Sequence, residues 1–347
     1  MSDSVARDRH LDDGMNRDDG RDRDDGMDLL LCDPSPALRL RVLTELLDVA
    51  PDDPEVLDLA RQRDAVARDW PGGDASADPK ALAFTLCRYA YEGIGRDNPE
   101  VAATAEQLFA VQEPDGSFPL RLFRRGRRDG VYSMLPLQAA LPLRGLAAAG
   151  YATDPRVERA YDWLLDKQLD DGAWPIGMAH GQPGYIAGYR KLPGSKGCRA
   201  TTQGALACLV LHPEHARSPR TRRALDFLLQ RETREEWALG AEVSRLAGVE
   251  PATGFVTFYA RFDLAFVLDL ASRAGASLDD GRVADLVDFL QQRRGPFGLW
   301  EHPAYPELSR WLTFDLLLSL RRLRSGEWSG MAPRVPFQAY PARRRRF

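Results

Sequence analysis

Apolar residues recur at helical spacing through most of the chain, and the helices that they predict come in pairs. From residue 80 on, each pair begins with a helix rich in small, aromatic and β-branched residues, followed by a more charged helix. Because the first helix of each pair is the more apolar, we expect it inside the molecule, with the charged helix outside. The first helices are expected at 80–93, 131–149, 198–211, 255–273 and 308–323, and the second at 98–113, 154–168, 217–230 and 280–293, with a further pair within 35–70.

A recurring turn ends the second helices. Gln168 to Trp174 read QLDDGAW and Gln112 to Phe118 read QEPDGSF, with Gln, Asp-Gly and an aromatic residue at the same offsets. Glycine at this point can adopt the left-handed conformation that closes a helix. The aromatic ring can then fold back over the helix end, where an indole N–H can reach a carbonyl. Weaker copies end at Trp237 and Trp300, so the period is about sixty residues, as in arrays of supersecondary units.

These hairpins predict an all-α fold, in which each pair covers the apolar face of its neighbours. We expect an (α/α) toroid of five to six hairpins in one domain over residues 29–330, with an open solenoid as the alternative. Residues 1–28 hold ten Asp and five Arg with few apolar residues, so we expect a disordered tail. Residues 331–347 are expected to be a flexible basic tail. The long connections at 121–130 and 178–196 are expected along one rim, where such arrays bind ligands.

Composition narrows the function classes. Of 347 residues, 44% are hydrophobic and the net charge is only −4, which indicates a globular chain with a core. Because the acidic N-terminal segment accounts for that charge, the near-neutral body argues against a nucleic-acid-binding surface. No apolar run predicts a transmembrane helix or a signal peptide. The four cysteines show no zinc-type pairing and predict reduced thiols in a cytoplasmic protein.

The helix pairs with Gln-x-x-Asp-Gly-x-aromatic turns resemble the prenyltransferase and squalene-hopene cyclase repeat, over roughly residues 80–325. This superfamily includes class II terpenoid cyclases and the β subunits of protein prenyltransferases. The resemblance implies an (α/α) barrel with an apolar central cavity, an isoprenoid or prenyl diphosphate as small-molecule partner, and Mg²⁺ or Zn²⁺ as the cofactors to consider. The turns mark the fold and not the chemistry, so the catalytic motifs are compared residue by residue.

Neither catalytic hallmark of the superfamily is complete. Class II cyclases protonate an alkene with an Asp of a DxDD motif on an inner helix, whereas the DxDD here, at residues 22–25, lies in the Asp/Arg tail. In the prenyltransferase pattern Cys198 matches the zinc-binding cysteine, but Lys196 stands where an Asp ligand is expected. His302 is near the expected histidine without matching its position. Cys198 and His302 are therefore weak metal candidates, and the sequence predicts no metal site.

Two acidic residues interrupt apolar inner helices and are the candidate catalytic acids, Asp263 and Asp315. Burial raises the pKa of a carboxyl group and favours its protonated form, which a proton donor requires. The alternative is a structural ion pair or hydrogen bond at each position.

A basic cluster and a set of aromatic residues are the candidate substrate contacts. Cations that flank the start of the inner helix at 198–211 can bind an anion such as a diphosphate, or form a solvated loop. Aromatic rings at the starts of inner helices can stabilise carbocations or simply pack in the core. The basic residues are Arg190, Lys191, Lys196 and Arg199, and the aromatic ones are Tyr132, Tyr259, Phe262 and Trp311.

The sequence therefore predicts an isoprenoid-acting enzyme, with the polyprenyl chain in the barrel and its head group at the basic rim. Cyclisation and prenyl transfer both remain open. One alternative is a non-catalytic isoprenoid- or lipid-binding protein that lacks the motifs. Another is an (α/α) carbohydrate-active enzyme, although the paired acids that it needs are not visible. The four Arg at 343–346 predict peripheral contact with acidic lipid headgroups.

Overall fold

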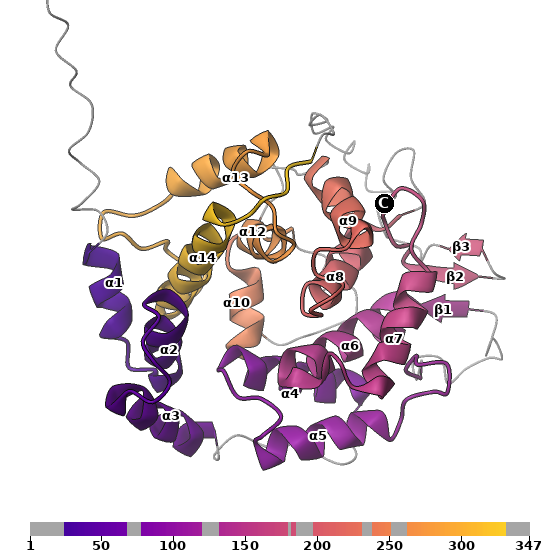
Figure 1. Cartoon of the computed structure of the whole chain (residues 1–347), viewed down its shortest axis with the longest axis horizontal. Helices are drawn as coiled ribbons and strands as arrows, with labels where there is room; N and C mark the ends of the chain where they lie inside the picture. Colours follow the sequence, from indigo (N-terminus) through magenta and orange to yellow (C-terminus); the bar gives the residue numbers. More distant parts are fainter. Residues whose placement is uncertain are drawn as a thin grey trace, which may run out of the picture.

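The computed structural model describes residues 24–67, 78–119, 132–179, 182–184, 197–230, 238–250 and 262–330. It is a ring of helices in two layers (Figure 1). The inner layer consists of α2 (Pro36–Arg41) with η1 (Val42–Leu46), α4 (Pro79–Tyr91), α6 (Leu141–Leu146) with η2 (Pro136–Ala140) and η3 (Ala147–Tyr151), α8 (Arg199–Leu209), α12 (Leu264–Arg273) and α14 (Ser309–Arg324). The outer layer consists of α1 (Asp24–Leu31), α3 (Pro54–Ala67), α5 (Pro99–Phe109), α7 (Pro155–Asp166), α9 (Pro219–Gln230) and α13 (Gly281–Gln291).

The inner layer closes on itself, which excludes the open solenoid. Contacts run from α4 through α6, α8, α12 and α14 to η1. The remaining joint, between α2 and α4, is a hydrogen bond from Arg41 Nη1 to the Tyr91 carbonyl at 2.9 Å. The predicted all-α toroid of helical hairpins is therefore confirmed.

Local sequence fixes where the outer helices begin. Asn98 and Asp154 cap α5 and α7 by accepting backbone N–H groups of the first turn. Three outer helices begin with a proline, Pro99, Pro155 and Pro219, at the first helical position, where the missing N–H is no loss. The inner and outer helices lie within a few residues of the predicted ranges wherever the chain is described.

The Gln–Gly–aromatic turns join each hairpin to the next one. Gln168 Nε2 donates both to the Gly172 carbonyl, which closes its own turn, and to the Arg220 carbonyl of α9, at 3.0 Å each. Gln112 makes the equivalent pair of bonds, to its own turn and to α7. The Trp174 indole N–H donates to the Leu164 carbonyl at 2.7 Å, as predicted. These turns are therefore the joints between neighbouring hairpins.

Replacing Gly172 with alanine is expected to destabilise the protein by about 1–3 kcal/mol. Gly172 has a φ of +85°, and an added Cβ would lie 2.6 Å from the backbone carbonyl of Arg223 on α9. Chemical denaturation would measure the loss. Gly281→Ala is the matched control, because no atom lies within 4 Å of a Cβ at Gly281. Equal stability of the two variants would show that the turn does not need its glycine.

Three short strands lie at the edge of the ring, beside α7 (Figure 1). They are β1 (Tyr132–Met134), β2 (Gly177–Ala179) and β3 (Gln182–Gly184), which pair antiparallel in that order. The sequence pattern predicts a helix from residue 131 and a loop after residue 178. Tyr132 therefore starts a strand and not an inner helix; its side chain lies outside the described part.

Two further differences concern the ends of predicted segments and the centre of the ring. Helix α1 begins at Asp24, inside the segment expected to be a disordered tail. The second difference is α10 (Ala241–Leu246), a six-residue helix between α9 and α12 that no pattern predicted. In Figure 1 it lies inside the ring of helices, between α14 and α8, and it packs against α4. This extra helix shapes the central cavity.

Candidate functional site

A cavity of about 250 Å³ occupies the centre of the ring. Every inner helix contributes to its wall, and so does α10. Its apolar lining includes Ala90, Ala207, Val243 and Phe266. Because ligand pockets usually measure about 300–1,000 Å³, this cavity suits a small ligand or one end of a longer one.

The wall of this central cavity is charged as well as apolar, which differs from the apolar centre that the resemblance implies. The basic residues on the wall are Arg41, Arg144, Arg273 and Arg322, and the acidic ones are Glu45, Glu242, Asp263, Asp269 and Asp315. Most of these charges are paired. For example, Asp269 lies 2.8 Å from Arg273 and 3.0 Å from Arg322. These arginines hold the pKa of Asp269 below its usual value although burial opposes them.

Asp315 differs from the other acids in the cavity. Its Oδ2 accepts a hydrogen bond from the Tyr91 hydroxyl at 2.9 Å, and no ion pair to its carboxyl group is found among the described residues. Burial raises the pKa of Asp315 to about 7, aided by the charge of Asp269 and opposed by the Arg41 guanidinium. Burial at the cavity wall therefore favours the protonated form of Asp315 more than is usual for an aspartate.

Asp263, the other candidate acid, is bound to backbone N–H groups at the start of α10. It accepts N–H bonds from Gly240 at 3.1 Å, from Glu242 at 2.7 Å and from Ala265 at 3.1 Å. Burial raises its pKa, and the backbone donors and Arg245 oppose that rise. Since the oxygens of Asp263 already accept these three hydrogen bonds, the geometry favours a structural role for Asp263 over a role as proton donor.

His302 also anchors α10, and neither of its ring nitrogens faces an open site. Its Nδ1 accepts the backbone N–H groups of Ala304 and Tyr305, at 3.2 and 3.0 Å. Its Nε2 lies 2.9 Å from both the Gly240 carbonyl and Ser244 Oγ. With both nitrogens in use, His302 does not fit a zinc ligand. Cys198, the other weak metal candidate, is buried at the N-terminus of α8 and joins no cluster of potential ligands in the described part.

Two of the predicted contacts, Arg199 and Phe262, lie together, and neither they nor Trp311 belong to the lining of the central cavity. The Arg199 guanidinium lies over the Phe262 ring, with 3.5 Å from its carbon to the ring centre, which is a cation–π contact. The centre of the Trp311 ring lies 4.9 Å from that of Tyr91, the residue whose hydroxyl binds Asp315. The candidates Arg190, Lys191, Lys196 and Tyr259 lie outside the described residues.

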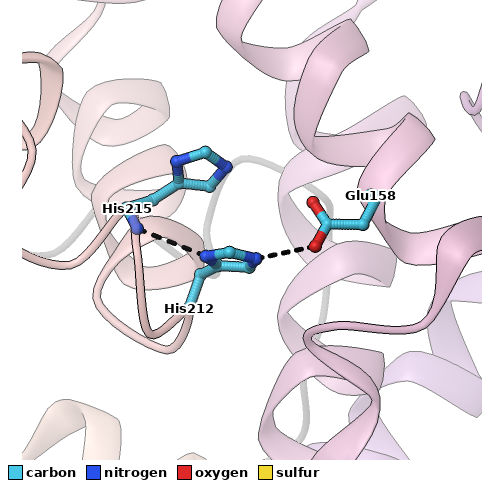
Figure 2. A group of neighbouring side chains, drawn as sticks. All are labelled: Glu158, His212 and His215. Carbon is cyan, nitrogen blue, oxygen red and sulfur yellow. Dashed lines mark hydrogen bonds and ion pairs between the residues drawn. The ribbon is translucent and has the colours of Figure 1, made fainter.

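A second cluster, which was not predicted from the sequence, joins α7 to the turn between α8 and α9 (Figure 2). Glu158 of α7 faces His212 and His215 from the turn before α9, and one potential ligand atom from each lies within 4.8 Å of the others. The spacing His-x-x-His is visible in the sequence, but Glu158 comes from another hairpin. The donor types suit a borderline metal such as zinc.

Hydrogen bonds argue against metal binding by this cluster. His212 Nδ1 accepts the N–H groups of Glu214 and His215 at 3.1 and 3.2 Å, so the proton of a neutral ring sits on Nε2. That Nε2 lies 2.9 Å from Glu158 Oε1 (Figure 2). A metal at Nε2 would need the proton on Nδ1, which faces two donors. The hydrogen bonds of His212 therefore stabilise the turn before α9.

We expect Zn²⁺ to leave the melting temperature of the protein unchanged, because His212 presents a proton to Glu158 and no lone pair. His212→Ala should lower stability by about 1–2 kcal/mol through loss of the turn bonds. His215→Ala, which keeps those bonds, is the control. Differential scanning calorimetry with and without Zn²⁺ would check this. A zinc-induced rise that both variants lose would contradict our assignment.

No helix in the described part of the chain has both the length and the apolar character to cross a bilayer.

The described helices form a closed (α/α) toroid of hairpins with Gln–Gly–aromatic joints, and comparisons with known proteins find partial similarities. The chain is 46% identical over 50 residues to a squalene-hopene cyclase of Schizosaccharomyces japonicus, a match that covers 14% of this chain and 8% of that enzyme. The chain thus matches less than a tenth of this curated relative.

Two solved structures of the type II terpene cyclase MstE from Scytonema are also similar, at 15% identity. The apo form matches with a TM-score of 0.40, covering 82% of this chain and 87% of that one. A substituted form with geranylgeranyl dihydroxybenzoate matches with a TM-score of 0.39, covering 71% of this chain and 66% of that one. No protein-family model matches the chain.

Proposed function

We propose that the protein is an isoprenoid-acting enzyme of the terpenoid-cyclase type, in which Asp315 donates the proton that starts the reaction. The observation that carries this proposal is the part-buried Asp315 carboxyl group on the wall of the central cavity, where burial raises its pKa to about 7. Because Tyr91 donates to Oδ2, the other oxygen of Asp315 is left to carry the acid proton. Protonation of an alkene or of an oxygenated group would start cyclisation without a metal ligand set.

The substrate would place its reactive end in the central cavity and its head group towards the basic rim. Of the four rim cations, Arg199 is described, and its contact with Phe262 holds its charge beside an inner-helix end. Arg190, Lys191 and Lys196 follow from the sequence as partners for an anionic head group. Small cavity volume favours a short isoprenoid over a long one.

A second candidate, a non-catalytic isoprenoid carrier, is favoured by the paired charges. Carbocation chemistry needs a wall that does not supply nucleophiles, and the cavity contains several carboxylates. In a carrier these ion pairs would only hold the inner helices together. The two functions differ in whether product is formed.

The proposal is tested by incubating the purified protein with geranyl, farnesyl and geranylgeranyl alcohols and diphosphates. Gas chromatography with mass spectrometry would detect cyclised products. Since the protonated form of Asp315 is the active one, product formation should fall as pH rises through about 7. Substrate binding without product at any pH between 5 and 9 would favour the carrier, and a rate that rises with pH would exclude Asp315 as the donor.

A further inference from the structure

The two faces of α10 line different cavities. Glu242, Val243 and Leu246 line the central cavity beside Asp315. Ala241 and Ser244, on the other face, line a second cavity of about 290 Å³. The spacing of these residues is the one expected for opposite faces of a single helix. Helix α10 is therefore a wall between two spaces of similar size.

The second cavity has a mostly apolar lining. Its described wall consists of Ala238, Leu239, Ala241, Ser244, Glu250, His302, Pro303, Ala304 and Tyr305. Among the described residues of this wall there is no arginine, in contrast to the central cavity. A hydrocarbon chain is the ligand chemistry that such a wall favours, because apolar surface gains free energy when it leaves water.

Helix α10 is held in place from three sides. Asp263 binds the Gly240 and Glu242 N–H groups from α12, and His302 contacts the Gly240 carbonyl. Glu242 forms a 2.6 Å ion pair with Arg144 of α6. Gly240 itself has a φ of +78°, and a Cβ there would lie 2.4 Å from the His302 ring. These anchors hold the wall in one position.

We propose that α10 sets the length of the hydrocarbon chain that the centre of the ring accepts. This inference rests on the proposed function for the isoprenoid nature of the chain. With α10 in place, only the end that reaches Asp315 finds room in the central cavity. Val243 and Leu246 form the stop on the α10 side of the central cavity, and the α10 backbone separates them from the second cavity. Removing these two side chains would enlarge the central cavity on its α10 side.

The double variant Val243→Ala/Leu246→Ala tests the proposal by binding, measured with isothermal titration calorimetry. The probes are hexanol and hexadecanol for chain length, with geraniol and geranylgeraniol for isoprenoid character. The native protein should prefer the short member of each pair. The variant should gain affinity for the long member by a factor of about four for each methylene group that enters the apolar space. Leu228→Ala on the outer helix α9 is the control for a buried truncation elsewhere, and should keep the native preference.

The outcomes separate this inference from the proposed function. If the variant gains affinity for hexadecanol but neither protein binds the two prenols, α10 sets chain length and the isoprenoid proposal is wrong. If the native protein binds geraniol but the variant shows the native length preference, the role of α10 is overturned alone. Absence of binding by all four probes would overturn both.

Discussion

Replacing Asp315 with asparagine is expected to reduce product formation by about 100- to 10,000-fold, the usual contribution of a general acid. Asparagine has a similar shape and still accepts the hydrogen bond from Tyr91, but it has no proton to donate. Initial rates at pH 6 would measure the loss. Activity within threefold of the native value would remove Asp315 from the mechanism.

The same substitution should increase stability, which separates lost chemistry from lost structure. Burial raises the pKa of Asp315 from its ordinary value near 4 to about 7. Between these values the unfolded state ionises while the folded state keeps its proton, so stability falls as pH rises through this window. Asparagine avoids this penalty, so its gain in melting temperature should be larger at pH 8 than at pH 5.

Tyr91→Phe tests whether the Tyr91 hydroxyl controls the pKa of Asp315. It keeps the acid but removes the hydrogen bond that lowers the pKa of Asp315. The pKa of Asp315 should therefore rise further, and the pH at which product formation declines should move upward. An unchanged pH profile would show that Tyr91 does not act on the acid.

Replacing Glu242 with glutamine is expected to destabilise the protein by about 3–5 kcal/mol, the usual effect of removing one partner of a buried ion pair. Glu242 is 5% exposed and binds Arg144 at 2.6 Å and Arg245 at 2.7 Å. The substitution leaves two buried guanidinium groups without this carboxylate. Urea denaturation would measure the change in the free energy of unfolding.

An exposed pair provides the control for this prediction. Asp58 lies 3.1 Å from Arg61 on the surface of α3, and Asp58→Asn should change stability by less than about 1 kcal/mol. The two arginines hold the pKa of Glu242 below its ordinary value although burial opposes them. Its stabilisation is thus present at neutral pH and is lost as pH falls through that lowered pKa. Similar losses in the two variants would show that the buried network does not hold α10.

The sequence predicted the repeating part of the fold because its signals are local. A glycine after Gln168 and an aromatic ring two residues later are enough to specify the turn and its bonds. The apolar face of each helix specifies which side is buried. Helix α10 gave no such signal, because six residues are too short for a helical period to be recognised.

The candidate site was predicted only in part, since it depends on contacts between distant helices. Asp315 was predicted as a candidate acid because it interrupts an apolar helix, but its partner Tyr91 lies 224 positions away in the chain. Asp263 gave the same local signal and is bound to backbone N–H groups of another segment. A sequence pattern cannot distinguish these two environments. The charges of Arg41 and Asp269 were missed because a helical pattern shows burial and not which charges meet.

The contact between η1 and α14 gives the array a property that open repeats lack. In a linear stack the end units have one neighbour and fray first, so that parts of the chain can open while the rest persists. Here each inner position has neighbours on both sides, and opening any hairpin breaks two interfaces at once. Loss of structure should therefore be all-or-none, and a protease would find either the intact ring or an unfolded chain.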